Sequence, residues 1–184
     1  MLPQRRAIVA AKGPTAARML RPLARCARAQ ACYATGMIPD VTLQSESGQV
    51  RVRDLVGGKV LVLYFYPKDE TPGCTAQACA FRDAYQDFTD AGADVIGVSA
   101  DSQDKHESFR EHHRLPFKLM TDPGGKAAAA FGVKKTLGLL PGRVTFVIDQ
   151  KGEIKHQFSS QLSIGKHIKE ALAVVKSLQP TSPA

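Results

Sequence analysis

The sequence predicts an α/β domain in which helices flank a central, mixed β-sheet, preceded by a separate N-terminal segment. Apolar, β-branched runs alternate with helical patterns along the chain, which is typical of a three-layer α/β domain. An antiparallel hairpin near the C-terminus adds reversed strands to the sheet. The basic excess of the chain is confined to its first 36 residues, which sets them apart from the remainder.

The folded part begins with a predicted N-terminal β-hairpin and a buried strand. Residues 41–43 and 50–52 are strand-like and flank the turn 46–48 (Glu-Ser-Gly). Residues 60–66 (VLVLYFY) form an unbroken apolar and aromatic run, as expected of a strand covered on both faces. No glycine-rich phosphate loop follows this strand, which disfavours a nucleotide-binding fold.

The rest of this region alternates helices and strands. Two predicted helices are ended by Gly92 and Gly132, and two others begin at Ser102 and Ser163, which marks most of the helix boundaries. The turn 149–152 (Asp-Gln-Lys-Gly) joins the last two strands. The predicted helices cover residues 73–90, 102–113, 126–131 and a closing segment from residue 163, and the predicted strands cover residues 93–99, 117–120, 143–148 and 154–158.

Residues 1–36 predict an organelle-targeting presequence, and residues 37–184 the folded domain. The segment is rich in Arg and Ala, holds seven of the 25 basic residues and no acidic one, and lacks the apolar core of a secretory signal. The absence of Ser leans slightly towards a mitochondrial leader, and both mitochondrion and plastid stay open. The alternative is a basic tail without targeting function on a cytoplasmic protein. Cys26 and Cys32 would leave with the presequence.

Composition excludes several functional classes. Outside the leader the chain carries 18 basic and 17 acidic side chains, so the net charge of +8 belongs to the leader. Nucleic-acid binding is therefore disfavoured, although a basic arm binding nucleic acid or a membrane stays an alternative. No apolar run reaches the roughly 20 residues of a membrane-spanning helix. Four cysteines are too few for a disulfide-dense secreted scaffold.

Cys74 lies where the predicted strand 60–66 gives way to the helix that starts near residue 73. The carboxyl ends of strands are where open α/β sheets place their active sites. The first turn of a helix offers free amide donors and the positive end of the helix dipole, and both favour a thiolate over a thiol. Position and residue type therefore predict a reactive, nucleophilic cysteine.

Cys79 follows Cys74 at a spacing that allows two interpretations. The pattern C-x4-C differs from the C-x-x-C of redox pairs and zinc sites, and no His lies near either cysteine in sequence, so a zinc site is poorly supported. On a continuous helix the two Cα atoms would lie roughly 8.6 Å apart, whereas a disulfide requires about 4.4–6.8 Å. Either the first helical turns unwind to form a bridge, or Cys79 is a small buried apolar residue.

Two runs resemble the peroxiredoxins, in particular the Q-type, also called the bacterioferritin-comigratory-protein type. They are residues 64–83 (YFYPKDETPGCTAQACAFRD) and residues 140–149 (LPGRVTFVID). The resemblance covers roughly residues 38–178 and leaves out the leader. It implies a thioredoxin-like fold, a monomer, and a cysteine-based thiol peroxidase that uses no metal, haem or flavin cofactor.

The resemblance also implies roles for five residues. Cys74 is expected to be the peroxidatic nucleophile and Cys79 the resolving cysteine. Thr71 is expected to hydrogen-bond the peroxide, Pro72 to shield the pocket, and Arg143 to complete it with a permanent cation. In this scheme a Cys74 sulfenic acid condenses with Cys79 to an intramolecular disulfide, which thioredoxin, or glutaredoxin, then reduces.

Taken without the resemblance, the same residues have simpler explanations. Thr71 and Pro72 are ordinary turn residues, and Arg143 is a surface strand residue after a Pro-Gly turn. A thiol–disulfide oxidoreductase or redox sensor would use the same two cysteines without significant peroxidase turnover. None of the five histidines matches a catalytic position of the family, and His112 and His113 are expected on a solvated helix end.

Overall fold

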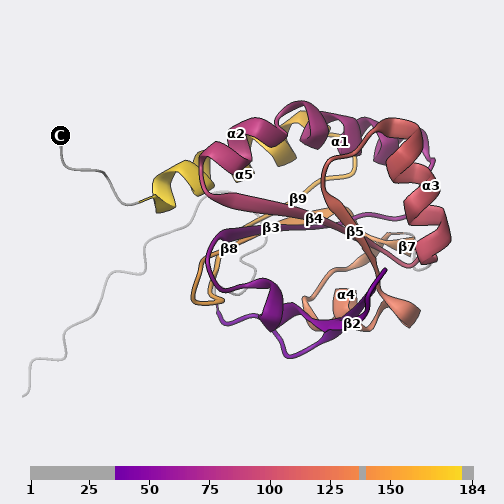
Figure 1. The fold of residues 1–184 in the computed structure, drawn as a ribbon, viewed down its shortest axis with the longest axis horizontal. Helices are drawn as coiled ribbons and strands as arrows, with labels where there is room; N and C mark the ends of the chain where they lie inside the picture. Colours follow the sequence, from indigo (N-terminus) through magenta and orange to yellow (C-terminus); the bar gives the residue numbers. More distant parts are fainter. Residues whose placement is uncertain (1–35, 137–139, 180–184) are drawn as a thin grey trace, which may run out of the picture. The chain divides into compact units, whose positions relative to one another are not determined.

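A computed structural model describes residues 36–136 and 140–179 of the chain (Figure 1). The predicted leader, with Cys26 and Cys32, lies outside the described residues. The strands of the main sheet are β1 (Thr42–Ser45), β2 (Gly48–Arg51), β3 (Val60–Phe65), β4 (Ala93–Ser99), β5 (Lys118–Thr121), β8 (Val144–Ile148) and β9 (Ile154–Ser159). A separate pair consists of β6 (Lys135–Thr136) and β7 (Leu140–Pro141).

The seven-stranded sheet is mixed, as the sequence predicts. Its order is β2-β1-β5-β4-β3-β8-β9, with β3 and β4 at its centre. The pairs β3–β4 and β4–β5 are parallel, whereas β3–β8 and β8–β9 are antiparallel. The predicted N-terminal hairpin is confirmed as β1 and β2. The central mixed sheet and the N-terminal hairpin expected of the thioredoxin-like fold are therefore present in the described residues.

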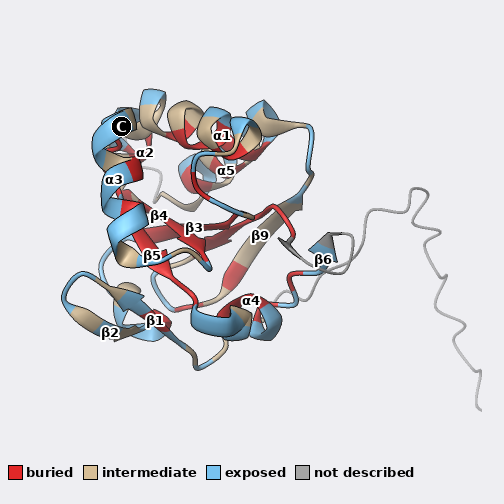
Figure 2. Ribbon diagram, turned by 90° about the vertical axis from the view of Figure 1, so that its right-hand side faces the viewer, coloured by how far each residue is buried: buried red, intermediate tan, exposed pale blue. Residues whose placement is uncertain are grey.

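Helices lie on both faces of this sheet. Figures 1 and 2 show α1, α2, α3 and α5 on one face, and α4 with the β1–β2 hairpin on the other. None of the helices in the described ranges is long and apolar enough to span a membrane. The helices are α1 (Pro72–Asp83), α2 (Tyr85–Asp90), α3 (Gln103–His113), α4 (Lys126–Ala130) and α5 (Ile164–Leu178), with short 3-10 turns at Val52–Leu55 and Pro123–Gly125.

Strand β3 is buried along its whole length and divides the core into two layers (Figure 2). Because side chains alternate along a strand, one set faces α1 and α5 and the other faces α4 and the hairpin. Burying each such apolar side chain contributes about 1.5–3 kcal/mol. The first set is Val60, Val62 and Tyr64, and the second is Leu61, Leu63 and Phe65.

A glycine in β4 allows the sheet to support α1. A Cβ atom at Gly97 would lie 2.6 Å from the Tyr64 hydroxyl oxygen, so only glycine leaves room for that ring. The Tyr64 ring in turn stacks on Phe81 of α1, with 4.6 Å between ring centroids. The centre of the sheet thus fixes where α1 lies.

The prediction of one helix over residues 73–90 is wrong in one respect, because the structure has two helices, α1 and α2, in this range. The break lies at Ala84, whose φ of −97° and ψ of 4° are not helical. Neither Gly nor Pro marks this position, so no breaker in the sequence announces it. The change of direction coincides with the burial of Phe81 and Phe88 on either side of it, with ring centroids 5.9 Å apart.

Candidate active site

Cys74 occupies the first turn of α1, directly after the loop that leaves β3. Thr71 is the extended N-cap residue of the helix and Pro72 its first residue, where the fixed φ of proline suits a helix start. The amide of Thr75 donates to the Thr71 carbonyl at 2.8 Å, which closes the first helical turn. The Cys74 side chain is only 2% exposed. The sulfur therefore lies at the positive end of a helix and out of bulk water.

The loop before α1 is held against α3 through Asp69, which is buried. The Tyr66 hydroxyl donates to one carboxylate oxygen of Asp69 at 2.6 Å, and His106 Nδ1 lies 2.7 Å from the other. Burial raises the pKa of Tyr66 well above its ordinary value, so the hydroxyl stays protonated. The Asp69 amide donates to Asp101 at 2.8 Å. This network holds the loop that contains Thr71 in place where it leads into the helix turn of Cys74.

Arg143 reaches Cys74 because β8 pairs with β3. Phe65 at the end of β3 lies opposite Val144, which places the preceding residue, Arg143, beside the start of α1. Its Nη2 donates to the Cys74 sulfur at 3.3 Å, although the two residues are 69 positions apart. Arg143 is 4% exposed, so its interpretation as a surface strand residue is wrong. A permanent cation faces the sulfur in a site that excludes water.

Gln77 orients this guanidinium, and the sequence analysis missed it. Arg143 Nη1 donates to Gln77 Oε1, and the Gln77 side chain is fully buried. Gly73 leaves space for the same group, since a Cβ there would lie 3.1 Å from Arg143 Nη2. The signal for Gln77 was its spacing: a polar residue three positions after Cys74 shares its face of the helix.

The other two predicted residues lie in the same turn as Cys74. The Thr71 hydroxyl donates to the Lys68 carbonyl at 3.1 Å and makes no cap hydrogen bond. Its lone pairs can therefore still accept a hydrogen bond from an incoming group. Pro72 is exposed at the first position of the helix. Thr71, Pro72, Cys74 and Arg143 are thus brought together around one helix start.

Cys79 is also a residue of α1, and both it and Cys74 are free thiols in the structure. Cys79 is half-buried, whereas Cys74 is buried. Because both are helical, the spacing argument applies: their Cα atoms are separated by roughly 8.6 Å along an intact helix. The wound form of α1 is therefore the form in which the two sulfurs are not bonded.

Two further buried groups border the site. The Tyr64 hydroxyl has no hydrogen-bond partner among the described residues, and burial raises the pKa of Tyr64 well above its ordinary value. The Thr145 hydroxyl of β8 lies 2.8 Å from His167 Nδ1, while His167 Nε2 donates to the Ser160 carbonyl at 2.9 Å. Burial lowers the pKa of His167 to about 4, so the ring is neutral at pH 7. These contacts tie β8 to α5 behind Arg143.

Sequence comparisons relate the chain to proteins of known family. Residues 35–157 match the AhpC/TSA family. A wheat (Triticum aestivum) protein named chloroplastic peroxiredoxin Q is 46% identical over 141 residues, which are 76% of this chain and 65% of the relative. The chain thus aligns with slightly less than two thirds of that relative's length. The chloroplastic peroxiredoxin Q of Sedum lineare is 45% identical over 77% of this chain and 76% of its own.

Solved structures give the same result. The peroxidoxin BcpB of Mycobacterium tuberculosis superposes with a TM-score of 0.72 at 36% identity, over 79% of this chain and 98% of that one. Peroxiredoxin Q of Xanthomonas campestris gives a TM-score of 0.67 at 32% identity, over 75% and 90% of the two chains. The chain belongs to the AhpC/TSA family and, within it, to the peroxiredoxins of the Q type.

Proposed function

We propose that this chain is a thiol peroxidase that reduces hydrogen peroxide and organic hydroperoxides to water and alcohols. The observation that carries the proposal is the 3.3 Å contact between Arg143 Nη2 and the buried sulfur of Cys74. A permanent cation and the start of a helix both stabilise negative charge on that sulfur, against the cost of burying it. A stabilised thiolate is the form of cysteine that attacks an O–O bond.

The first step is oxidation of Cys74. Its thiolate attacks one peroxide oxygen, an S–O bond forms, and the O–O bond breaks. Cys74 loses two electrons and becomes a sulfenic acid, while the departing oxygen takes the electron pair and the proton that the Cys74 thiol released on ionising, and leaves as water or an alcohol. Arg143 stabilises the negative charge on that oxygen as it develops, because its donors are already oriented by Gln77.

Thr71 and Pro72 are proposed to position the peroxide. The Thr71 hydroxyl already donates to the Lys68 carbonyl at 3.1 Å, so it would accept a hydrogen bond from the peroxide O–H. This leaves the second peroxide oxygen facing the guanidinium. Pro72, as the first residue of the helix, would border the sulfur on the solvent side. The assignment predicts that Thr71→Val raises KM and lowers kcat, since the acceptor is lost.

The second step joins the two cysteines. The Cys79 sulfur attacks the Cys74 sulfur, an S–S bond forms, the S–O bond breaks, and water leaves with the Cys79 proton. Because a disulfide requires Cα atoms about 4.4–6.8 Å apart, the first turns of α1 must unwind. That end of the helix is suited to opening, since Pro72 and Ala76 are exposed.

A dithiol protein must then reduce the bridge by thiol–disulfide exchange, and we assign this role to thioredoxin, with glutaredoxin as the alternative. Unwinding of α1 would expose the bridge to it. We further propose that the protein is a monomer, because both cysteines belong to one helix. Light scattering after size-exclusion chromatography tests the monomer, and a dimer of the reduced chain would contradict it.

Residues 1–36 are proposed as a presequence that directs the domain at 37–184 to a plastid. The basis is the name of the relatives from wheat and Sedum lineare, which are chloroplastic. The slight compositional lean towards a mitochondrion finds no support in those names. A fluorescent protein fused behind residues 1–36 should accumulate in plastids of plant cells, and a mitochondrial or cytosolic signal would overturn this proposal.

The function is tested by mixing the reduced chain with one equivalent of hydrogen peroxide and mapping its cysteines by mass spectrometry. We expect a Cys74–Cys79 bridge within seconds and its reversal by thioredoxin. Cys74→Ser should abolish peroxide consumption altogether, because no other group replaces the thiolate. Cys79→Ser should still form the sulfenic acid but lose the bridge, which makes it the matched control.

The same experiment separates the thiol peroxidase from a thiol–disulfide oxidoreductase or redox sensor. A sensor or oxidoreductase would leave both thiols reduced for many minutes in peroxide, yet exchange quickly with a protein disulfide. Peroxide turnover with thioredoxin that persists in Cys74→Ser would contradict both the Cys74 peroxidase and the oxidoreductase or sensor. It would show that the chemistry lies elsewhere in the chain.

A further inference from the structure

Three potential metal ligands meet at the edge of the molecule where the loop before α1 contacts the end of α3. Glu70 belongs to that loop, and His112 and His113 are the last two residues of α3. His112 Nδ1 lies 3.1 Å from one carboxylate oxygen of Glu70, and His113 Nε2 lies 3.2 Å from the other. One ligand atom from each residue lies within 4.8 Å of both others.

This convergence is specific to one place. Within residues 36–136 and 140–179, no other group of three His, Cys, Asp or Glu residues brings its ligand atoms so close. A similar contact between an imidazole and a carboxylate joins His156 Nε2 to Glu170 at 3.1 Å. That pair supplies one imidazole and one carboxylate, so it makes a useful control.

The distances suit a small tetrahedral ion. Zinc binds imidazole nitrogen and carboxylate oxygen at roughly 2.0–2.2 Å, which places neighbouring ligand atoms about 3.4 Å apart. The contacts of 3.1 Å and 3.2 Å, one to each carboxylate oxygen, are close to that spacing, and one ligand atom from each residue already lies within 4.8 Å of the others, so small side-chain rotations complete the arrangement. Two imidazoles and one carboxylate also form a known zinc ligand set, with a fourth position left for water.

His113 is the fixed member of the group. Its side chain is 18% exposed, and its ring packs edge-on against Phe109 with 4.9 Å between centroids. Its carbonyl accepts a hydrogen bond of 2.9 Å from Arg82 Nη1. A ligand held by packing and by its backbone loses little freedom when an ion binds.

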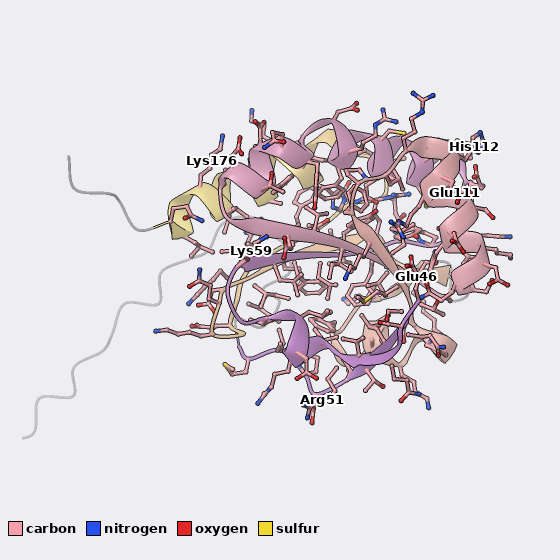
Figure 3. The ribbon with its side chains drawn as sticks, viewed as in Figure 1. Glu46, Arg51, Lys59, Glu111, His112 and Lys176 are labelled. Atoms are coloured by element: carbon pink, nitrogen blue, oxygen red, sulfur yellow. The ribbon has the colours of Figure 1, made fainter. Side chains whose placement is uncertain are left out.

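Glu70 and His112 are the adjustable members. Their side chains are 51% and 70% exposed, and His112 lies at the periphery of the molecule (Figure 3). The backbone of Glu70 is in the left-handed region, with φ of 58°, and its carboxylate contacts the end of α3. The preceding residue, Asp69, is already bound to His106 of the same helix at 2.7 Å. The loop therefore presents Glu70 from an anchored position.

We infer that Glu70, His112 and His113 bind a divalent ion of the zinc class. Imidazole nitrogen favours Zn²⁺, Ni²⁺ and Cu²⁺, whereas Mg²⁺ and Ca²⁺ prefer oxygen ligands. The ion replaces the hydrogen bonds that now join the carboxylate to the two rings. It ties the residue next to Thr71 to the end of α3. The site uses neither cysteine, so zinc binding can be measured separately from the proposed peroxidase chemistry.

The test is a calorimetric titration of the reduced, untagged full chain with Zn²⁺. Thiols also bind zinc, so the result is the difference between matched variants. Glu70→Gln and His113→Ala should each remove one bound equivalent or weaken it by at least roughly tenfold. His156→Ala should leave binding unchanged. Glu70→Gln keeps the shape of an exposed side chain, which covers the case in which His113→Ala disturbs the helix end.

Hydrogen exchange then locates the ion. Zn²⁺ should slow amide exchange at residues 69–71 and 112–114 of the wild-type chain, and not in Glu70→Gln. Mg²⁺ at the same concentration should have no effect. Equal zinc binding by the wild type and Glu70→Gln would overturn the inference, as would loss of the equivalent in His156→Ala. Equal protection by Mg²⁺ would overturn the assignment to the zinc class.

Discussion

Strand β3 and helix α1 follow one another in the chain and meet at the Cys74 sulfur, yet they are held in different ways. Every side chain of β3 is buried, and the strand is paired on both sides, with β4 and with β8. Helix α1 buries four of its twelve residues and begins with an exposed proline. The strand contributes a fixed partner, Arg143, through its pairing with β8. The helix contributes both cysteines and, in the proposed cycle, would have to change shape to join them.

The comparison indicates a division of labour between a rigid support and a movable element. A fixed guanidinium is useful for the first step, because preorganised donors need no rearrangement when charge develops. A helix end is useful for the second step, because it can open without loss of the global fold. Changes in the sheet should therefore affect stability or peroxide attack, and changes in α1 should affect formation of the bridge.

The largest effect is expected from a cavity in the sheet. Leu63 is fully buried on the face of β3 opposite α1, so Leu63→Ala should lower the free energy of unfolding by about 2–5 kcal/mol. Urea unfolding measures the loss. The rate of bridge formation in the folded variant should stay as in the wild type, and a large change in that rate would break the proposed separation.

The next effect concerns the fixed cation. Arg143→Met removes the donors that face Cys74 and Gln77, and should lower kcat/KM for hydrogen peroxide by roughly 10²–10³-fold. Arg53→Met, at an exposed position, is the matched control and should leave the rate unchanged. Circular dichroism checks that both variants are folded. A loss below tenfold in Arg143→Met would mean that the cation is not part of the chemistry.

A third prediction tests the rigid support through the pH dependence of its stability. Burial lowers the pKa of His167 to about 4 from an ordinary 6.5, so between these values the unfolded chain binds a proton that the folded chain does not. Stability therefore rises with pH across this window, is complete above pH 6.5, and is lost as the pH falls towards 4. The contribution is on the order of 3 kcal/mol.

The check is urea unfolding of the wild type and His167→Gln at several pH values from 4 to 7. The variant should lack the His167 share of the slope, because the titrating group is gone. Parallel curves for the two proteins would contradict the assignment. They would mean that the ring between Thr145 and Ser160 contributes nothing to the pH dependence.

The sequence predicted the sheet better than the helices. Residues 60–66 and 93–99 are unbroken apolar runs, so their strands could be read directly, and β3 and β4 lie there. The break at Ala84 could not be predicted, because it depends on tertiary packing and not on a helix-breaking residue. The two-residue strands β6 and β7 have no apolar run at all.

The features of the site also differ in how well the sequence predicts them. The position of Cys74 at a helix start followed from local pattern, but its contact with Arg143 followed only from family resemblance, since strand pairing brings the two together. Gln77 and His167 were missed because polar residues on helices are usually solvated, and here both are buried. Spacing held the signal: Gln77 follows Cys74 by three positions, and His167 precedes Ala171, on the buried face of α5, by four.

The smallest expected effect tests the central claim most directly, namely that the first turns of α1 unwind before the cysteines bond. Ala76 is exposed and lies between Cys74 and Cys79, so Ala76→Gly weakens that turn by about 1 kcal/mol without touching either sulfur. Ala173→Gly makes the same change at an exposed position of α5 and serves as the control.

The measurement is the rate at which the Cys74 sulfenic acid converts to the bridge, followed by rapid quenching and mass spectrometry. If unwinding precedes bonding, Ala76→Gly should form the bridge up to about fivefold faster, since 1 kcal/mol corresponds to that factor in the open population. Ala173→Gly should match the wild type. An unchanged or slower rate in Ala76→Gly would contradict the claim that α1 must open.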